Sequence, residues 1–433
     1  MALSPHPTRV ICFLFLLPLL SVQSQNTLSS LSTMSDYLQK HTGKHIDKPF
    51  VLSVDSSKKT HAVWTQYDKY GSKSQKDSSF IYYAQSSDAG KTWNKTKPIS
   101  FFGGNCVDGD STLKGPNLCL GNKGELYATW ASPKGLAFQK STDGGSTWLK
   151  QEKIINPIKN GWQYVVDGVK TNGLPIVACD LSYSEFRNRI YVCWSDEKYG
   201  VKHKDVFLVY SDDGGENWTE PVLVTYRPNH KEQFNPRMAI DKTTGYVYLL
   251  YFDKQNVADG KNTDLYLAKS KNGGLLYEYY KVNEVAHQTS ALLFSNKWLA
   301  LKAFNDTITI NWAFVKRKAD TVFCQAVFND STFNAYNKKA QLQDKELTLE
   351  KTLLFAHKII VPFNLEKNAN ITAIITKPLE PKFEKLITKN KHYLAGNNKL
   401  IIDTKALGLR KGNYILTLYY NGQNKFAWIL GSE

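Results

Sequence analysis

The sequence predicts an all-β protein, with a β-propeller of five to six four-stranded blades at 25–340 and a small β-sandwich at 341–433. Two observations carry this prediction. A short polar phrase of the form Ser-X-Asp-X-Gly-X-Thr-Trp recurs after strand-like runs, and no long amphipathic helical pattern occurs in the 433 residues. A chain of this length can bury the core of a large repeated domain and of a smaller one.

The phrase marks one repeating unit each time it occurs. Its copies are Ser86–Trp93, Ser141–Trp148, Ser211–Trp218 and, in degenerate form, Ser270–Tyr277. Before each copy, two β-rich runs flank a turn such as Asn122-Lys123-Gly124, and a third run leads into the phrase. The phrase then turns the chain into a fourth strand, so every unit is an antiparallel meander of propeller-blade length. A fifth unit without the phrase is visible at 291–328.

The phrase itself predicts a structural corner. Its Asp can accept hydrogen bonds from nearby backbone N–H groups, its Gly supplies the positive φ of the reversal, and its Trp is expected to pack on its own blade. We therefore expect Asp88, Asp143 and Asp213 to be structural. A calcium loop would need alternating oxygen ligands and a distal Glu, which the copies lack.

The N-terminus predicts an export signal over 1–24, with Arg9 before an apolar run and a cleavage site after Ser24. No other run is long enough to span a membrane, so we expect a secreted or cell-surface monomer without a transmembrane segment.

The cysteines that follow the expected signal show no CxxC spacing, and the sequence predicts neither a metal site nor a cofactor. Either a Cys106–Cys119 bridge forms or the thiols stay separate and buried. The cysteines are Cys106, Cys119, Cys179, Cys193 and Cys324.

The formal net charge of +16 comes from single lysines spread along the chain, and arginine is scarce. Nucleic-acid binding proteins instead cluster their basic residues, so we exclude a nucleic-acid partner. Two explanations stay open, a compositional bias of the genome and an acidic glycan or glycoprotein partner.

The repeated phrases resemble the Asp-box, or BNR repeat, of sialidases and related secreted β-propellers, over about 45–330. The resemblance implies a propeller that acts on or binds glycans, and the family includes both enzymes and proteins without catalysis. A sialidase, as the family implies, holds the substrate carboxylate with three arginines, the first in a Phe-Arg-Ile-Pro motif. At the matching place this chain has DKPFVLSV, 47–54, without arginine. No sialidase catalytic residue is therefore carried over.

A site is expected where the loops between second and third strands meet the crossings between blades, on the face opposite the repeated corners. Carboxylates recur there and could act as general acid and base. The candidate catalytic residues are Asp108, Asp110, Asp196, Glu197 and Asp253. The candidate ligand-binding residues are Arg237, expected to face the central cavity, His230 beside it, and Trp162 and Tyr164, expected to stack on sugars.

The C-terminal segment is strand-rich and contains a tight turn at Asn421-Gly422. Its run from Gly412 to Leu418 resembles the C-terminal sorting domains of proteins exported across the outer membrane in Bacteroidetes. An accessory or carbohydrate-binding sandwich is the alternative.

Three function classes follow: a glycan-active hydrolase, including a divergent sialidase-like exo-glycosidase; a non-catalytic glycan- or protein-binding propeller; and an extracellular structural module. Two facing carboxylates in a central pocket would favour the enzyme, an aromatic rim the binder, and a filled apolar channel the structural role.

Overall fold

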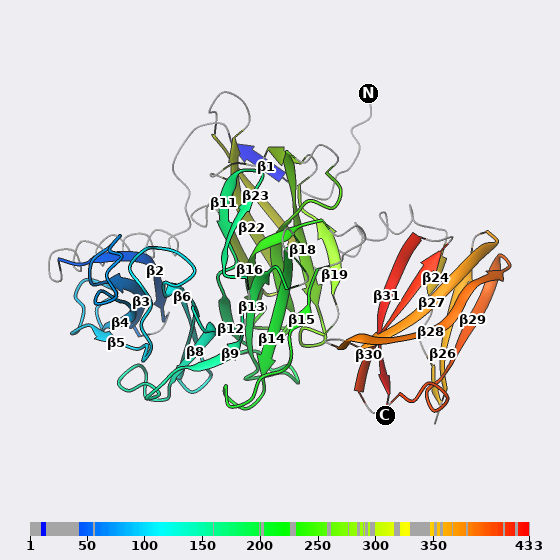
Figure 1. The fold of residues 1–433 in the computed structure, drawn as a ribbon, viewed down its shortest axis with the longest axis horizontal. Coiled ribbons are helices and arrows are strands. Elements are labelled where there is room, and N and C mark those ends of the chain that lie inside the picture. The colour runs from blue at the N-terminus through cyan, green and yellow to red at the C-terminus, as the bar shows by residue number, and fades with distance from the viewer. Residues whose placement is uncertain are drawn as a thin grey trace. The chain divides into compact units, whose positions relative to one another are not determined.

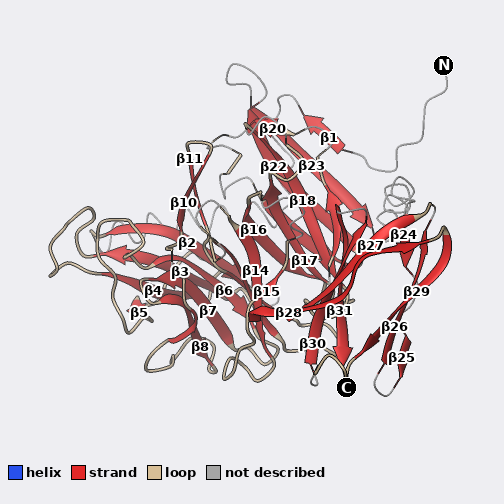
Figure 2. Cartoon of the chain, turned by 45° about the vertical axis from the view of Figure 1, so that its right-hand side comes forward, coloured by secondary structure: helices blue, strands red, loops and turns tan. Residues whose placement is uncertain are grey.

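The computed structural model is all-β in the residues that it describes (Figure 2), which confirms the predicted class. These residues are 10–13, 43–54, 57–158, 160–198, 200, 203–225, 231–257, 261–275, 277–283, 286–288, 290, 293–294, 299–315, 321–329, 347–349, 353–355, 358–365, 367–377, 380–409, 412–420 and 423–432. None of them belongs to a helix long and apolar enough to cross a membrane. The chain divides into two compact units, Met1–Phe328 and Asn329–Glu433.

The first unit contains four antiparallel meanders with their strands in chain order (Figure 1). The first sheet is β2 (His45–Ser53), β3 (Thr60–Tyr67), β4 (Ser79–Ser86) and β5 (Lys97–Pro98). The second is β6 (Lys114–Leu120), β7 (Leu126–Ser132), β8 (Gly135–Ser141) and β9 (Lys153–Asn156). The third is β12 (Ile176–Cys179), β13 (Ile190–Asp196), β14 (Asp205–Ser211) and β15 (Val222–Leu223). The fourth is β16 (Gln233–Ile240), β17 (Val247–Asp253), β18 (Asn262–Ser270) and β19 (Glu278–Lys281), with β20 (His287–Gln288) paired to β18.

A fifth sheet confirms the unit expected at 291–328. Its strands are β21 (Ala300–Phe304), β22 (Thr307–Val315), β23 (Thr321–Asn329) and β1 (Val10–Phe13). β1 lies inside the range of the expected signal and pairs antiparallel with β23. Cleavage after Ser24, which stays a prediction, would remove this edge strand.

The strand that begins each sheet, here called a first strand, lies beside the first strand of the next sheet: β2 beside β6, β6 beside β12, β12 beside β16, and β16 beside β21. The second strands are covered on both faces. Every residue of β7, β13 and β17 is buried, and Trp64, Trp130 and Trp194 are 0% exposed. All three are core residues: Trp130 and Trp194 pack between successive sheets, and Trp64 packs with Trp93 of its own repeat.

The repeated corners have the predicted hydrogen bonds. In the second copy, Asp143 accepts from the Thr147 N–H at 2.8 Å and the Thr147 hydroxyl at 2.6 Å, and the Ser141 hydroxyl accepts from the Gly145 N–H at 2.8 Å. The same pattern recurs around Asp88 and Asp213. These bonds hold the pKa of Asp143 down at about 2, as expected for a structural carboxylate.

The corner tryptophans were expected to pack on their own sheet, and two of them also contact the preceding sheet. Trp93 packs with Trp64 of its own sheet. Trp148 meets Tyr83 of the preceding sheet edge-on at 5.1 Å, and Trp218 meets Phe138 of the preceding sheet at 5.0 Å. The corners therefore join successive sheets, because the flat face of one sheet offers the apolar surface that the corner of the next covers.

A short hairpin, β10 (Gln163–Val166) and β11 (Val169–Asn172), is inserted between the second and third sheets. Sequence reasoning placed an irregular loop there. The Asp167 carboxylate at its tip pairs with Lys254, which follows β17.

The second unit has two sheets. One contains β24 (Leu347–Leu349), β25 (Leu353–Phe355), β26 (Lys358–Leu365) and β29 (Gly396–Asp403). The other contains β27 (Ala369–Lys377), β28 (Glu380–Tyr393), β30 (Gly412–Tyr420) and β31 (Gln423–Ser432). Buried side chains of both sheets form one apolar cluster. Strand β28 was not predicted, and the Asn421-Gly422 turn lies outside the described residues.

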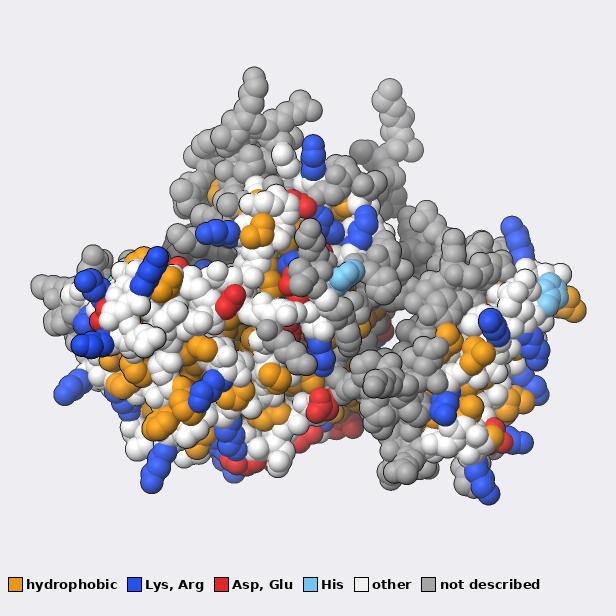
Figure 3. All heavy atoms as spheres, viewed as in Figure 1, with side chains coloured by type: hydrophobic (Ala, Val, Ile, Leu, Met, Phe, Trp, Pro, Cys, Tyr) orange, Lys and Arg blue, Asp and Glu red, His pale blue; other side chains and the backbone are white. Residues whose placement is uncertain are grey.

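Lysine and arginine side chains are dispersed over the face shown in Figure 3 and do not gather in one patch. This agrees with the spread of lysines along the sequence.

Candidate functional site

Three first strands are bulged near their beginnings, each just before a proline. The register shifts lie between Asp47 and Phe50, Lys114 and Asn117, and Phe234 and Arg237. The positive φ values belong to Lys48 (49°), Gly115 (63°) and Asn235 (55°), and proline follows each. A bulge turns a side chain away from the regular alternation, so these strands present charged residues at one end. The recurring proline is the sequence signal that could have located this end, and it was missed.

Lys114 is the centre of this end. Its side chain is 5% exposed and its ammonium pairs with both Asp47 and Asp108. It also donates to the Tyr67 hydroxyl at 3.3 Å. Burial alone would lower the pKa of Lys114, but the bonds to the two carboxylates outweigh it and hold the pKa above its ordinary value. A single ammonium therefore holds two carboxylates near each other.

Asp108 is an ionised carboxylate that accepts hydrogen bonds. Its φ is 58°, and it accepts a hydrogen bond from the Tyr70 hydroxyl at 3.1 Å. Burial raises its pKa, yet the hydrogen bond and charge of Lys114 bring it below the ordinary value. At neutral pH this carboxylate can accept hydrogen bonds or act as a base, but it cannot serve as the acid.

An exposed aromatic surface adjoins Asp108. Tyr70 is 48% exposed, its ring stacks on His45 at 4.0 Å, and it meets Tyr67 edge-on at 5.1 Å. Tyr70 was overlooked in the sequence, where only the acidic residues of such loops were considered. Tyr70 offers the ring face that the sequence assigned to Trp162 and Tyr164.

Arg237 lies on β16, as expected, and is half-buried. Its guanidinium donates to the Pro236 carbonyl at 2.7 Å and the Leu299 carbonyl at 3.3 Å, and no carboxylate among the described residues forms an ion pair with it. Burial lowers its pKa to about 10, so Arg237 stays charged at neutral pH. It is a cation held by neutral carbonyls.

Charges from the bulged ends of β2, β6 and β16 act on one side chain, Lys48. Partial burial lowers the pKa of Lys48, and the charges of Lys114 and Arg237 lower it further while Asp47 and Asp108 oppose them. We call Asp47, Lys48, Asp108, Lys114 and Arg237 the charged cluster. It holds three cations and two carboxylates, so one positive charge is in excess.

Asp110, expected to be catalytic, fixes the inserted hairpin. Its carboxylate accepts the backbone N–H groups of Trp162 at 2.8 Å and Gln163 at 2.9 Å. Trp162 and Tyr164 are 3% and 4% exposed, and the Tyr164 hydroxyl donates to the Ser195 carbonyl at 2.7 Å. Both rings are buried, Tyr164 within the hairpin and Trp162 directly before it, and their expected stacking on sugars stays a prediction.

The remaining candidates lie at the same end of the sheets but below the surface. Asp196 is 3% exposed, and burial raises its pKa. Glu197 pairs with Lys204 at 2.9 Å, and Lys204 also pairs with Glu232. Asp253 is 0% exposed, and burial raises its pKa to about 7. Asp196 and Asp253 are thus buried, and their expected catalytic role stays a prediction. His230 lies outside the described residues.

No protein-family model and no curated protein matches the chain. Among solved structures, an α-L-arabinofuranosidase from Fusarium graminearum has a TM-score of 0.38 and 14% identity, covering 66% of this chain and 93% of its own. An α-L-arabinanase from Penicillium chrysogenum has a TM-score of 0.39 and 14% identity, over 66% and 93%. The NanB sialidase from Streptococcus pneumoniae has a TM-score of 0.39 and 10% identity, over 82% and 68%. These structural neighbours are glycoside hydrolases, and at these scores they assign neither a family nor an activity to the chain.

Within the described part of the chain, no three His, Cys, Asp or Glu side chains gather so that they could hold a metal ion. The charged cluster, with its excess positive charge, can bind an anion beside an aromatic ring, and its carboxylates can accept hydrogen bonds from hydroxyl groups.

Proposed function

We propose that the first unit is a secreted β-propeller that binds a glycan bearing carboxylate groups at the charged cluster. The five sheets act as blades, because their first strands follow one another side by side. The charge of Arg237 in the fourth sheet acts on Lys48 in the first, which supports a shared axis between them.

The observation that carries the proposal is Arg237, a half-buried cation without a carboxylate partner among the described residues. A guanidinium binds a carboxylate with two parallel hydrogen bonds, which neither a neutral sugar nor a lysine side chain reproduces. Lys48 adds positive charge, and the exposed Tyr70 offers a ring face to the sugar next to it. Asp47 and Asp108 are placed to accept hydrogen bonds from sugar hydroxyls.

Calorimetric titration with oligosaccharides tests this function. Uronate- or sialate-containing oligosaccharides are expected to bind, and their neutral, carboxyl-reduced counterparts to bind at least about tenfold more weakly. Arg237→Lys is expected to reduce the affinity about tenfold, since the bidentate geometry is lost while the charge remains. Arg187→Lys is the control, because that side chain contacts Asn122 instead. Equal binding of the neutral sugars would contradict the proposal.

Hydrolysis is the second candidate, favoured by the two carboxylates that share Lys114. A retaining glycosidase uses two closely spaced carboxyl groups, one of them protonated. Asp108 would be the base or nucleophile, and the acid would have to be another group. A screen of chromogenic glycosides, including a sialoside, with Asp108→Ala and the exposed control Glu185→Ala, distinguishes a hydrolase from a binder. Turnover that is lost only in Asp108→Ala supports the hydrolase, and turnover that survives in Asp108→Ala excludes its role.

We further propose that the signal over 1–24 is removed on export and that the second unit is a β-sandwich with an accessory or sorting role. N-terminal sequencing of the exported protein is expected to begin at Gln25. A mature chain that begins at Met1 or Ala2 would retain β1 in the fifth sheet.

A further inference from the structure

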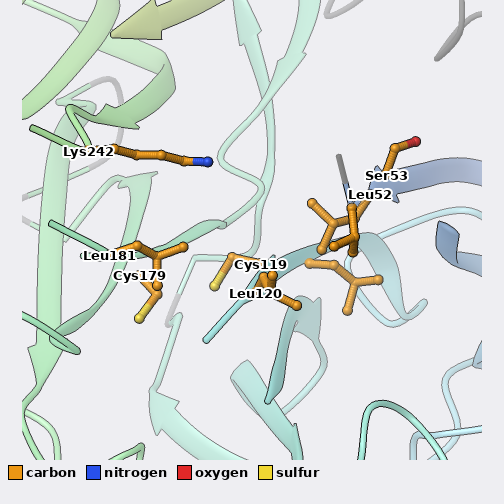
Figure 4. Close-up of a pocket in the computed structure, with 9 residues that line it drawn as sticks. Leu52, Ser53, Cys119, Leu120, Cys179, Leu181 and Lys242 are labelled. Atoms are coloured by element: carbon orange, nitrogen blue, oxygen red, sulfur yellow. The ribbon is translucent and has the colours of Figure 1, made fainter. Parts of the chain in front are cut away.

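The ends of β2, β6 and β12 away from the charged cluster surround a cavity of about 380 Å³. Leucine side chains such as Leu52 and Leu118 make much of its wall. Two thiols, Cys119 and Cys179, lie on its other side, and the Lys242 ammonium points into it (Figure 4). A cavity of this size admits small molecules. The two thiols are thus reachable through one opening.

Both thiols belong to neighbouring first strands and to one apolar cluster. The Asn117 side-chain oxygen on β6 accepts the Val177 N–H of β12 at 3.1 Å, so the Asn117 side chain points toward β12. Cys119 lies two residues further along β6, and residues two apart in a strand point to the same face, so Cys119 points toward β12 as well. Cys179 of β12 is buried in the apolar cluster against which Cys119 packs.

A third side chain supports this proximity. Burial and the charge of Glu125 raise the pKa of the Tyr127 hydroxyl, and the charges of Cys179 and Cys119 both raise it further. Cys179 also raises the pKa of Cys119 after burial has done so. Tyr127 lies in the same apolar cluster as Cys179 and Cys119, and both cysteines are free thiols.

Of the two alternatives left open by the sequence, separate thiols or a bridge from Cys106 to Cys119, the bridge is wrong for a geometric reason. Cys106 precedes β6 and its carbonyl accepts the Gly71 N–H near the charged cluster, whereas Cys119 lies at the far end of the strand. A strand of seven residues spans roughly 20 Å. A disulfide needs Cα atoms within about 7 Å.

We propose that Cys119 and Cys179 form a disulfide that joins β6 to β12 when the protein meets a low-molecular-weight disulfide, and that the cavity admits this reagent. One protein thiol loses its proton, attacks a sulfur of the reagent and releases one reagent thiolate. The second protein thiol loses its proton and attacks the mixed disulfide at the protein sulfur, which releases the other reagent thiolate. The protein loses two electrons and two protons, and the reagent becomes two thiols.

The reaction is slow near neutral pH and accelerates in base, because the thiolate is the nucleophile and burial raises the pKa of Cys179 to about 12. The bridge would close a loop across the second and third sheets and so restrict the unfolded chain.

The test is treatment of the folded, full-length protein with glutathione disulfide at about pH 9, followed by intact mass and a tryptic map. We expect a mass loss of about 2 Da and one cross-linked pair, 115–123 with 171–187, each peptide holding a single cysteine. The bridged form is expected to have a higher midpoint of thermal unfolding.

The variants separate pairing from simple reactivity. Cys119→Ser and Cys179→Ser are each expected to abolish the mass loss and to carry a single glutathione adduct, whereas Cys106→Ala keeps the cross-link. Near-ultraviolet circular dichroism reports whether each variant folds. If a variant does not fold, the tryptic map of the wild-type protein still tests the Cys119–Cys179 cross-link. The proposal is overturned if both thiols carry separate adducts, if the cross-link joins another cysteine, or if only protein unfolded in urea reacts.

Discussion

The two ends of the first strands differ in register and in chemistry. At one end, β2, β6 and β16 are bulged before a proline and carry the charged cluster. At the other end, the same strands keep regular pairing and lie on the side of the repeated corners, and the ends of β2, β6 and β12 surround a cavity with leucine side chains in its wall. The regular end serves packing between sheets. The irregular end brings charged side chains together, and this contrast is why the proposed site is placed there.

The largest effect is expected at the regular end, from Gly145→Ala. An added Cβ would lie 1.9 Å from the buried Tyr83 hydroxyl oxygen, and φ is +93°. We expect a loss of about 4 kcal/mol in the free energy of unfolding, from overpacking and backbone strain together. Gly144→Ala is the matched control, since φ is +66° but nothing lies within 4 Å, and it should lose only about 1 kcal/mol. Equal losses in urea unfolding would mean that the corner does not dock on the preceding sheet.

At the irregular end, Lys114→Met should cost about 3 kcal/mol, because it leaves Asp47 and Asp108 beside each other without their shared cation. Glycan binding should also weaken, since the two carboxylates repel an anionic ligand. Lys153→Met removes an ammonium from a more exposed pair with Glu216 and should cost under about 1 kcal/mol. A Lys114 variant as stable as the Lys153 control would show that the ammonium does not hold the cluster together.

Asp253→Asn tests a buried carboxyl next to the same end. Burial, together with the charges of Asp264 and Asp205, raises its pKa to about 7, whereas the unfolded chain has an aspartate pKa of about 3.9. Between these values the folded state keeps a proton that the unfolded state has lost. Wild-type stability therefore falls as pH rises from about 4 to about 7, and the variant should gain roughly 2 kcal/mol on wild type across that window. A constant difference between the two proteins at about pH 4.5 and about pH 8 would show that the native carboxyl is already ionised.

The smallest effect is expected from Ser141→Ala. The Ser141 hydroxyl is buried, accepts the Gly145 N–H and donates to Asp143 at 2.8 Å, so its removal leaves a buried donor unpaired. We expect a loss of about 1 kcal/mol in the free energy of unfolding. The exposed Ser146→Ala should lose under about 0.5 kcal/mol. A larger loss for Ser146→Ala than for Ser141→Ala would show that the exposed hydrogen bonds of the corner stabilise it more than the buried ones.

The sequence predicted the strands and corners well because their signals are local. Asp143 and Gly145 form their hydrogen bonds with residues of the same repeated phrase, so the phrase alone determines the turn. The contact of Trp148 with Tyr83 of the preceding sheet was not predicted, since a repeat shows which residues are apolar but not which neighbouring sheet they cover. Asp108 and Arg237 were named from the sequence and belong to the charged cluster, while Lys114 and Tyr70 were missed. The burial of Asp196 and Asp253 was not predicted because the depth of a loop acid depends on the inserted hairpin and on neighbouring sheets, which are distant in sequence.

The prolines at the bulges also affect the partly folded chain, before the sheets have packed together. A first strand is the edge of its sheet, and an unpaired edge is a template for another chain. Pro49, Pro116 and Pro236 each remove an N–H donor from that edge, and the bulge beside each one bends it. A half-made chain leaving the ribosome thus carries its own protection against aggregation, placed on the strands that will later border the ligand.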